Sequence, residues 1–312
     1  MTSSGTVPLR EYLHARRAEI DEALRQALPA APACPLVIAE SMRYSLFAGG
    51  KRFRPVLTLA AAEAVAGDRP EVRRVAMPAA CAIEIIHTYS LIHDDLPAMD
   101  NDTMRRGKPT LHVVYGEGMA ILAGDGLLTE AFALLAHESE ADGGAARTAR
   151  TLAVMWRLAS AAGAAGMVGG QAIDLHAAGH GHDGALTPDG LRDMHARKTG
   201  ALIRAAAVAG AIMAGGTASQ VAAVDDYAAA LGLAFQIVDD ILDVEGAGDE
   251  LGKTVGKDAA ANKPTYPAFF GLAESKRMAR AATDNALAAL QREGLHQSRL
   301  ADIAAWVVSR TS

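Results

Sequence analysis

The 312-residue sequence has few cysteines and few aromatic residues. Cys34 and Cys81 are its two cysteines, too few for a disulfide framework, so both are expected to be small buried apolar residues. Aromatic residues make up only 4% of the chain, but hydrophobic residues make up 50% and charged residues 21%. This composition allows a large core and excludes an intrinsically disordered chain.

A dense run of basic residues is also absent. The 30 Lys and Arg residues are outnumbered by 36 Asp and Glu, which gives a formal net charge of −6. We therefore expect no nucleic-acid partner, because such proteins usually carry a basic stripe. Residues 1–30 contain acidic and basic side chains but no apolar signal core, which predicts a cytoplasmic protein.

Long uninterrupted apolar runs are missing as well. Arg157 and Arg204 interrupt the two longest, 151–170 and 201–218, which leaves them short of the roughly 20 residues that a bilayer requires. No membrane span is expected. Since no Pro/Ser-rich or charged linker offers a boundary, residues 1–312 are predicted to form a single domain.

Alanine is abundant, and the alternation of β-branched residues that marks strands is nearly absent, so the sequence predicts an all-α protein. Segments 77–92 and 228–242 are apolar on most faces, which places them in the centre of a bundle. The expected helices are 8–28, 35–48, 54–66, 71–94, 117–139, 145–163, 167–177, 187–214, 219–244, 263–282, 284–293 and 297–308, with a short helical turn at 112–116.

Two aspartate clusters follow long apolar segments. A carboxylate in apolar surroundings is costly unless it is paired or binds a metal. In the second cluster, Asp239 and Asp243 are spaced i,i+4 and share one helix face, so they can converge on one cation.

The first cluster has a less regular spacing. Asp94 and Asp100 are six residues apart, but Pro97 distorts the helix between them, and this can bring both to a common metal with Asp95 in support. Because the clusters offer only oxygen ligands, they favour Mg²⁺, held together with substrate phosphates.

Basic residues next to glycines or to the acids predict a phosphate-bearing substrate, since Arg offers a planar fork of donors and Lys a point charge. They stand at Lys51, Arg52 and Arg54, at Arg105, Arg106 and Lys108, at Lys198, and at Lys253, Lys257 and Lys263.

Gly49 and Gly50 lack the Walker spacing, so a nucleotide P-loop is not expected. The His-rich stretch 176–182 is rich in glycine and lacks rigid zinc-ligand spacing, so we interpret it as a surface loop.

These features occur as ordered motifs: Gly-Gly-Lys-Arg-x-Arg-Pro at 49–55, Arg-Arg-Gly-Lys-Pro-Thr at 105–110, Leu-Ala-Gly-Asp at 122–125, Gly-Gln-x-x-Asp-Leu at 170–175, Lys-Thr-Gly at 198–200, and further blocks at 252–258 and 263–267. With the two aspartate clusters, the chain resembles the trans-polyprenyl diphosphate synthases, of the short-chain bacterial farnesyl type, over nearly its whole length. The resemblance implies an isoprenoid synthase-type bundle of about ten or more helices around a central apolar cavity.

The resemblance also implies a reaction. An allylic diphosphate, dimethylallyl or geranyl, loses its diphosphate, and the double bond of isopentenyl diphosphate attacks the carbocation to give farnesyl diphosphate. Three Mg²⁺ per site are implied, which Mn²⁺ can replace, acting on the leaving diphosphate. The implied metal ligands are Asp94, Asp95, Asp100, Asp239 and Asp243.

Substrate contacts follow from the same motifs. The family-matched contacts to the allylic diphosphate are Arg105, Lys198 and Lys257. Those to isopentenyl diphosphate are Gly50, Lys51, Arg54, His87 and Arg106. The carbonyl of Thr199 and the amide oxygen of Gln236 are implied to face the cation. No side-chain base is implied, because released diphosphate can take the proton.

Product length is implied to depend on the helix before the first cluster. Tyr89 and Ser90 lie five and four residues before Asp94, and the aromatic ring of Tyr89 resembles the floor that stops growth at fifteen carbons. Asn101 stands where many relatives have a further Asp.

Several alternatives stay open. A geranylgeranyl or geranyl diphosphate synthase fits the same motifs. A terpene cyclase shares the implied fold, but the acids at 239, 240 and 243 argue against its usual second metal motif. A non-catalytic regulatory subunit usually lacks one acid cluster, and here both are present. A homodimer is expected from the family and from the prevalence of two-fold oligomers.

Overall fold

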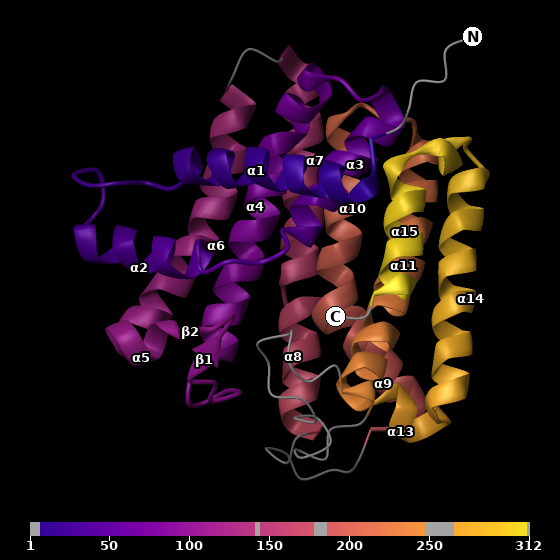
Figure 1. The fold of residues 1–312 in the computed structure, drawn as a ribbon. Helices are drawn as coiled ribbons and strands as arrows, with labels where there is room; N and C mark the ends of the chain where they lie inside the picture. Colours follow the sequence, from indigo (N-terminus) through magenta and orange to yellow (C-terminus); the bar gives the residue numbers. More distant parts are fainter. Residues whose placement is uncertain (1–6, 141–143, 178–185, 247–264, 311–312) are drawn as a thin grey trace.

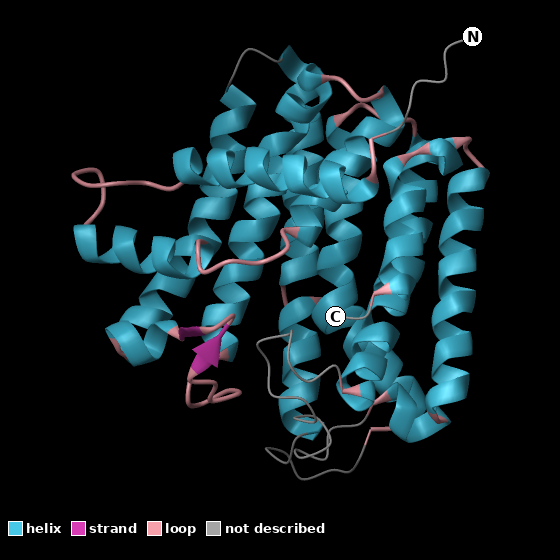
Figure 2. Cartoon of the chain, viewed as in Figure 1, coloured by secondary structure: helices cyan, strands magenta, loops and turns pink. Residues whose placement is uncertain are grey.

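A computed structural model describes residues 7–140, 144–177, 186–246 and 265–310. Within these ranges the chain is helical apart from loops and one small hairpin, which confirms the predicted all-α bundle (Figure 2). The helices are α1 (Leu9–Ala27), α2 (Leu36–Leu46), α3 (Phe53–Ala66), α4 (Pro70–Asp94), α5 (Leu111–Tyr115), α6 (Glu117–Glu140), α7 (Gly144–Ala162), α8 (Met167–Leu175), α9 (Pro188–His195), α10 (Ala201–Met213), α11 (Ala218–Glu245), α13 (Tyr266–Phe270), α14 (Leu272–Gln291) and α15 (Arg299–Ser309). A π-helical turn, η2 (Ala196–Gly200), precedes α10, and a 3-10 turn, η3 (Leu295–Gln297), precedes α15.

The helix ends follow local sequence signals. Gly67, with φ of 90°, ends α3, and Pro70 begins α4 in the first turn, where a missing N–H costs nothing. Thr217 and Gln220 form a reciprocal capping box at the start of α11. Gly246, in the left-handed conformation, ends the same helix.

The centre of the bundle is built around α10, which packs against α3, α4, α7 and α11 (Figure 1). Small residues allow this close packing: a side chain at Gly210 would meet the carbonyl oxygen of Thr58 on α3. The apolar segment 77–92 lies within α4 and is buried over most of its length, as predicted. The other, 228–242, forms the second half of α11, which packs against α10 and α14.

The expected helix 187–214 is confirmed, since α9, the π-helical turn and α10 follow one another without a break, although the π-helical turn was not expected. Two other predictions of secondary structure were wrong. The expected break near residue 283 is absent, since α14 continues through Thr283, whose buried hydroxyl donates to the carbonyl of Ala279. A hairpin of β1 (Met104–Arg105) and β2 (Lys108–Pro109) was not expected, and Arg106 and Gly107 form its two-residue turn, both with positive φ.

Four helical segments are long and apolar enough to cross a membrane, judged by length and composition alone, although the sequence suggested that the apolar runs were too short. They are Pro70–Asp94, Glu117–His137, Gly144–Leu175 and Ala218–Glu245. In the fold, 67% of the apolar window of α4 is buried, but only 33% of that in α6 and 28% of that in α7–α8. The apolar character of α4 is therefore explained by the core, whereas α6 and α7 leave apolar surface exposed.

Candidate active site

The first aspartate cluster folds back on the end of α4. The backbone N–H of Asp100 donates to the carbonyl of Asp94 at 2.8 Å, and that of Asn101 donates to Leu96 at 3.1 Å. Asn101 takes a positive φ of 53°, a conformation that asparagine tolerates better than most residues. The turn brings Asp100 beside Asp94 despite their six-residue spacing.

Asp94 is an unusually basic carboxylate. Burial raises its pKa to about 6, the Lys198 ammonium opposes this shift, and the Asp100 carboxylate adds to it. A carboxylate that is partly removed from water and faces another acid gains more than an exposed one when a cation arrives. Asp94 therefore has the environment of a metal ligand.

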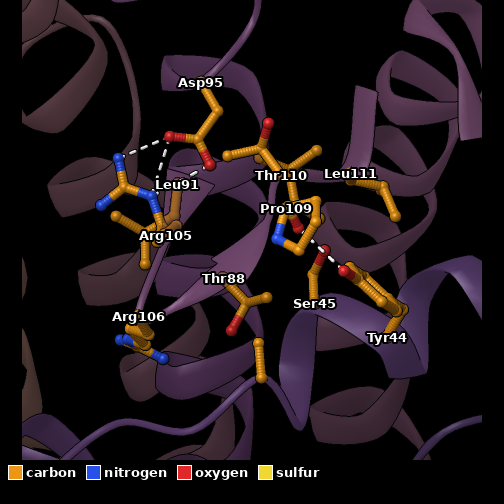
Figure 3. A pocket seen from close by; sticks show the side chains of 12 residues that line it. Tyr44, Ser45, Thr88, Leu91, Asp95, Arg105, Arg106, Pro109, Thr110 and Leu111 are labelled. Carbon is orange, nitrogen blue, oxygen red and sulfur yellow. Dashed lines mark hydrogen bonds and ion pairs between the residues drawn. The ribbon is translucent and has the colours of Figure 1, made fainter. Parts of the chain in front are cut away.

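Asp95 points to a different partner (Figure 3). Both of its oxygens accept hydrogen bonds from Arg105, at 2.6 to 2.9 Å, and its side chain is buried. Burial raises the pKa of Asp95 and the Arg105 guanidinium opposes the shift. Asp102 lies 3.8 Å from the same guanidinium. Asp95 thus holds the hairpin to the end of α4, and Arg105 is held in place by the cluster that it follows.

The hairpin and α2 enclose a pocket of about 360 Å³ on one side of α4, part of it open to solvent (Figure 3). Thr88, Leu91 and Asp95 line it from α4 and its end, while Tyr44 lines it from α2 and donates to the Pro109 carbonyl at 2.8 Å. Asp94 comes one residue before Asp95 and is therefore rotated by about a quarter of a helical turn from it. The pocket adjoins the acid cluster without containing Asp94.

The Gly-Gly-Lys-Arg segment is anchored by Arg52, a residue of the first basic motif whose side chain turns out to be paired within the protein. Arg52 is 3% exposed, adopts a left-handed φ of 51°, and donates to Asp21, to Glu84 and to the carbonyl of Leu46. These contacts hold the turn between α2 and α3, and so determine where its neighbour Lys51 lies.

The predicted isopentenyl diphosphate contacts are brought together. The Arg106 side chain lies on Gly50, where a side chain would clash with it, and donates to the carbonyl of Gly49. Burial lowers the pKa of Arg54 to about 10, with Glu84 opposing. Burial also lowers the pKa of His87 well below its usual range, and the charges of Arg54 and Arg106 add to this shift. His87 is therefore neutral at neutral pH.

Lys198 and Thr199 lie on the π-helical turn, a feature often found at functional sites. The Lys198 ammonium lies 2.5 Å from the Asp174 carboxylate. Burial lowers its pKa, but Asp174 and then Asp94 more than offset this and raise it. Gly170 packs against the backbone of Lys198, because a side chain there would come within 2.2 Å of the Lys198 nitrogen.

Gln236 is half-buried on α11, one turn beyond Gly232. A side chain at Gly232 would come within 3.3 Å of the Gly200 α-carbon, so α11 and the π-helical turn approach closely there. The structure therefore places the turns that carry Thr199 and Gln236 next to each other.

The second cluster divides its acids in a similar way. Asp240 is buried and accepts from the backbone N–H of Tyr266 at 2.9 Å. Asp239 is more exposed and lies 3.0 Å from the guanidinium of Arg310, and Asp243 follows one turn later, half-buried. Asp239 and Asp243 therefore remain on the accessible face of α11.

Arg310 is a site residue that sequence analysis missed. Its side chain is 6% exposed and lies over the rings of Phe235, 4.1 Å from the ring centroid, and Trp306. Arg310 and Asp239 both influence the pKa of Lys51, which burial lowers, so the three charged groups are neighbours. The only sequence signal is the i,i+4 spacing of Trp306 and Arg310.

Not every predicted site residue can be placed. Lys257, an expected allylic diphosphate contact, lies outside the described residues, as do Lys253, Lys263 and most of the His-rich stretch. In the part of the chain that the structure describes, no group of three or more His, Cys, Asp or Glu side chains forms a ready metal site.

The residues present nevertheless fit a hard cation. Asp94, Asp100 and Asp239 offer oxygen donors only, and Mg²⁺ usually needs one or two carboxylates together with substrate phosphates. The half-buried Asp94, with its raised pKa, is the observation that favours such an ion. A complete protein cage is not required for this mode of binding.

Tyr89 and Ser90 lie on α4, before the first cluster. Tyr89 is 7% exposed, its ring packs edge to face against His93, and burial raises its pKa. Ser90 is half-buried, and its hydroxyl donates to the carbonyl of His87 at 2.9 Å. Tyr89 therefore presents the larger fixed side chain of the two.

Comparisons with known proteins agree with this geometry. The polyprenyl synthetase family model matches residues 35–303. The chain is 48% identical over 268 residues to a farnesyl diphosphate synthase of Geobacillus stearothermophilus, covering 86% of each chain. It is 44% identical over 274 residues to a geranylgeranyl diphosphate synthase of Cyanophora paradoxa, covering 87% of this chain and 86% of that protein.

A solved structure is also similar. An FPP/GFPP synthase from Zymomonas mobilis superposes with a TM-score of 0.81 and 35% identity, covering 96% of this chain and 98% of the other. The similarity in fold and sequence extends across both aspartate clusters and the basic residues near them. The chain belongs to the polyprenyl synthetase family and is a prenyltransferase of the prenyl diphosphate synthase type.

Proposed function

We propose that this prenyltransferase condenses isopentenyl diphosphate with dimethylallyl or geranyl diphosphate, in a Mg²⁺-dependent reaction, to give farnesyl diphosphate. The observation that supports this most is that each acid cluster lies close to cations of the basic motifs. Asp94 interacts electrostatically with Lys198 and Arg105, while Asp239 acts on Lys51 and Arg54. Two diphosphates need this arrangement of charge, and a single-anion site does not.

Asp94, Asp100 and Asp239 would hold Mg²⁺ on the allylic diphosphate, with Asp243 as a further family-matched ligand and Asp95 in support through its contact with Arg105. Bound Mg²⁺ supplies Lewis-acid stabilisation of the departing diphosphate. Arg105 and Lys198 add fixed positive charge on the same side, and both are held by carboxylates before substrate arrives. These two side chains therefore need little rearrangement when the diphosphate departs.

Lys51, Arg54 and Arg106 would bind isopentenyl diphosphate, whose charge balances the mutual repulsion of these cations. Neutral His87 would serve there as a hydrogen-bonding group rather than as a charge. The Thr199 carbonyl and the Gln236 amide oxygen would face the carbocation, and no side-chain base is needed because released diphosphate takes the proton.

The fifteen-carbon product is proposed from Tyr89. Its ring is nearly fully buried on α4, one turn before Asp94. Replacing it by a small residue, Tyr89→Ala, is expected to lengthen the product. The second candidate is a geranylgeranyl diphosphate synthase, which the similarity to the Cyanophora enzyme favours.

We also propose that the active form is a homodimer. The support is a set of exposed large apolar side chains on two neighbouring helices: Leu152 and Trp156 on α7 are 58% and 65% exposed, and Ile121 and Leu122 on α6 are 45% and 56% exposed. Burial of such side chains against a second copy would remove them from water. Sedimentation should show a dimer that Trp156→Glu weakens; a wild-type monomer would overturn this proposal.

The direct test incubates purified protein with isopentenyl diphosphate and either dimethylallyl or geranyl diphosphate, with Mg²⁺ and separately with EDTA. Products are then resolved by carbon number. A Mg²⁺-dependent fifteen-carbon product supports the full proposal, and a twenty-carbon product supports the second candidate. Absence of condensation would favour a non-catalytic regulatory subunit instead.

A further inference from the structure

His93 has no role in the function proposed above, yet it makes specific contacts between α4 and α6. Its Nε2 atom lies 3.1 Å from the carbonyl oxygen of Ile121. Since a carbonyl only accepts, Nε2 must carry the proton and donate it. The carboxylate of Asp125 lies 3.9 Å from the same nitrogen, on the next turn of α6. His93 therefore joins the end of α4 to the facing helix.

The imidazole lies directly on Gly124. A side chain at this position would come within 2.1 Å of Nε2 and 2.5 Å of Cδ2 of His93. Glycine is unfavourable inside a helix, so an interior glycine needs a reason. Gly118, in the same helix, provides the contrast, because a methyl group there would meet no atom within 4 Å. Gly124 of the Leu-Ala-Gly-Asp motif thus supplies the space for His93, and Ile121, the residue before the motif, supplies the acceptor group.

The imidazole of His93 also packs against Tyr89. The two residues are spaced i,i+4 on α4, and their ring centroids are 5.7 Å apart with an interplanar angle of 81°. This edge-to-face arrangement is the favoured geometry for aromatic rings. In the described part of the chain, His93 is the ring that pairs with Tyr89. The orientation of Tyr89 therefore depends on a side chain that is itself fixed by α6.

We propose that His93 is a specificity-positioning residue: seated on Gly124 and hydrogen-bonded to Ile121, it holds the Tyr89 ring across the product pocket and so limits chain length. The inference rests on the proposed function, in which Tyr89 forms the floor. Without the imidazole, the Tyr89 ring has another side-chain rotamer available to it, and the floor opens. His93 acts through Tyr89 and need not touch substrate.

The test measures product lengths for His93→Ala, Tyr89→Ala and the double variant. His93→Ala should raise the ratio of longer to wild-type-length products by up to about tenfold, the most that one edge-to-face pair supplies. The double variant should match Tyr89→Ala alone, because His93 has nothing left to position. Additive lengthening would overturn a role that passes through Tyr89.

Gly124→Ala gives a second route that keeps the histidine. The added methyl must displace the imidazole, so products should lengthen as in His93→Ala, and combining both changes should add nothing further. Gly118→Ala, the same substitution in open space on α6, is the matched control and should leave the products unchanged. Folding of each variant is checked by circular dichroism.

The outcomes separate the two proposals. If Tyr89→Ala lengthens the product while His93→Ala and Gly124→Ala do not, the positioning role is overturned and the proposed function stands. If Tyr89→Ala leaves product length unchanged, the floor assignment is wrong and the positioning role is lost with it. Absence of condensation by the wild-type protein overturns the proposed function itself.

Discussion

The two aspartate clusters each bury one acid of an adjacent pair, but they use different partners for it. In each adjacent pair, the second acid is turned inward and the first is left for a ligand. Asp95 is buried against the side chain of Arg105, whereas Asp240 is buried against the backbone N–H of Tyr266. A pair of aspartates in such a motif therefore contains one structural acid and one accessible acid.

The accessible acids differ in their neighbours. Asp94 shares a partly buried environment with Asp100 and is opposed by Lys198, which itself is paired with Asp174. Asp239 is more exposed and is paired with Arg310, close to the end of the chain. The first cluster is thus preorganised within the bundle, while the second is controlled by a residue from a distant part of the sequence.

The largest expected effect tests the division between accessible and structural acids. Asp94→Asn and Asp239→Asn should each lower kcat/KM by about 100- to 1000-fold, the range seen when one group that stabilises transition-state charge is lost. Asp240→Asn should have a much smaller effect, because the amide oxygen can still accept from Tyr266. Steady-state kinetics with saturating Mg²⁺ measures all three. Equal losses for Asp239 and Asp240 would contradict the division.

The next effect concerns stability at the first cluster. Arg105→Leu leaves the Asp95 carboxylate buried without its partner and should lower the free energy of unfolding by about 3 kcal/mol. Adding Asp95→Leu removes the orphaned charge and should restore much of the loss. Urea unfolding at neutral pH measures both variants. If the double variant is no more stable than Arg105→Leu, the pair is not the cause.

Most of the fold could be predicted from the sequence, because alanine-rich helices are separated by glycine and proline. The hairpin was missed because it has two residues a strand, and its turn uses Arg106 with Gly107 instead of the stronger Asn-Gly signal. The π-helical turn has no local signal. Its Lys198 packs closely against Gly170, a tertiary contact that local sequence does not reveal.

In the candidate site, too, the residues found from local sequence patterns differ from those that depend on tertiary contacts. Acids and bases clustered in the sequence were found from spacing and family resemblance, and the structure brings Asp94, Asp100 and Lys198 together. Arg310 was missed because its contact with Asp239 spans 71 positions of the chain, and no periodicity connects them. Isolated residues that act through long-range pairs are the ones that sequence patterns leave out.

A third prediction concerns His195, the buried last residue of α9, which comes just before the π-helical turn that carries Lys198. Burial lowers the pKa of His195 to about 4, so the folded protein keeps it neutral. The unfolded chain takes up a proton below about pH 6.5, and the folded chain does not, so stability is full above that pH and falls as the pH drops towards 4. Between pH 7 and pH 5 this amounts to about 2 kcal/mol.

The measurement compares urea unfolding of the wild type and His195→Phe at pH 7 and pH 5. The variant cannot titrate at this position, so it should lose about 2 kcal/mol less than the wild type between the two values. Equal losses would mean that His195 is protonated in the folded state.

The smallest expected effect tests whether Arg310 limits metal binding at Asp239. Arg310→Met keeps an apolar side chain against Phe235 and Trp306 but removes the guanidinium from Asp239. Because Asp239 is 43% exposed, the pair contributes only modestly, and metal affinity should rise by up to about fivefold. Mn²⁺ titration followed by electron paramagnetic resonance detects this without substrate turnover.

The matched control is Arg299→Met, at the other end of α15, where the guanidinium lies 2.9 Å from Asp302 and over the ring of Tyr12. It removes the same charge from the same helix without touching Asp239. If both variants raise Mn²⁺ affinity equally, the effect reflects net charge alone. If only Arg310→Met raises Mn²⁺ affinity, the arginine competes with the metal for Asp239. The two clusters then differ in this respect, because the lysine near Asp94, Lys198, is already paired with Asp174.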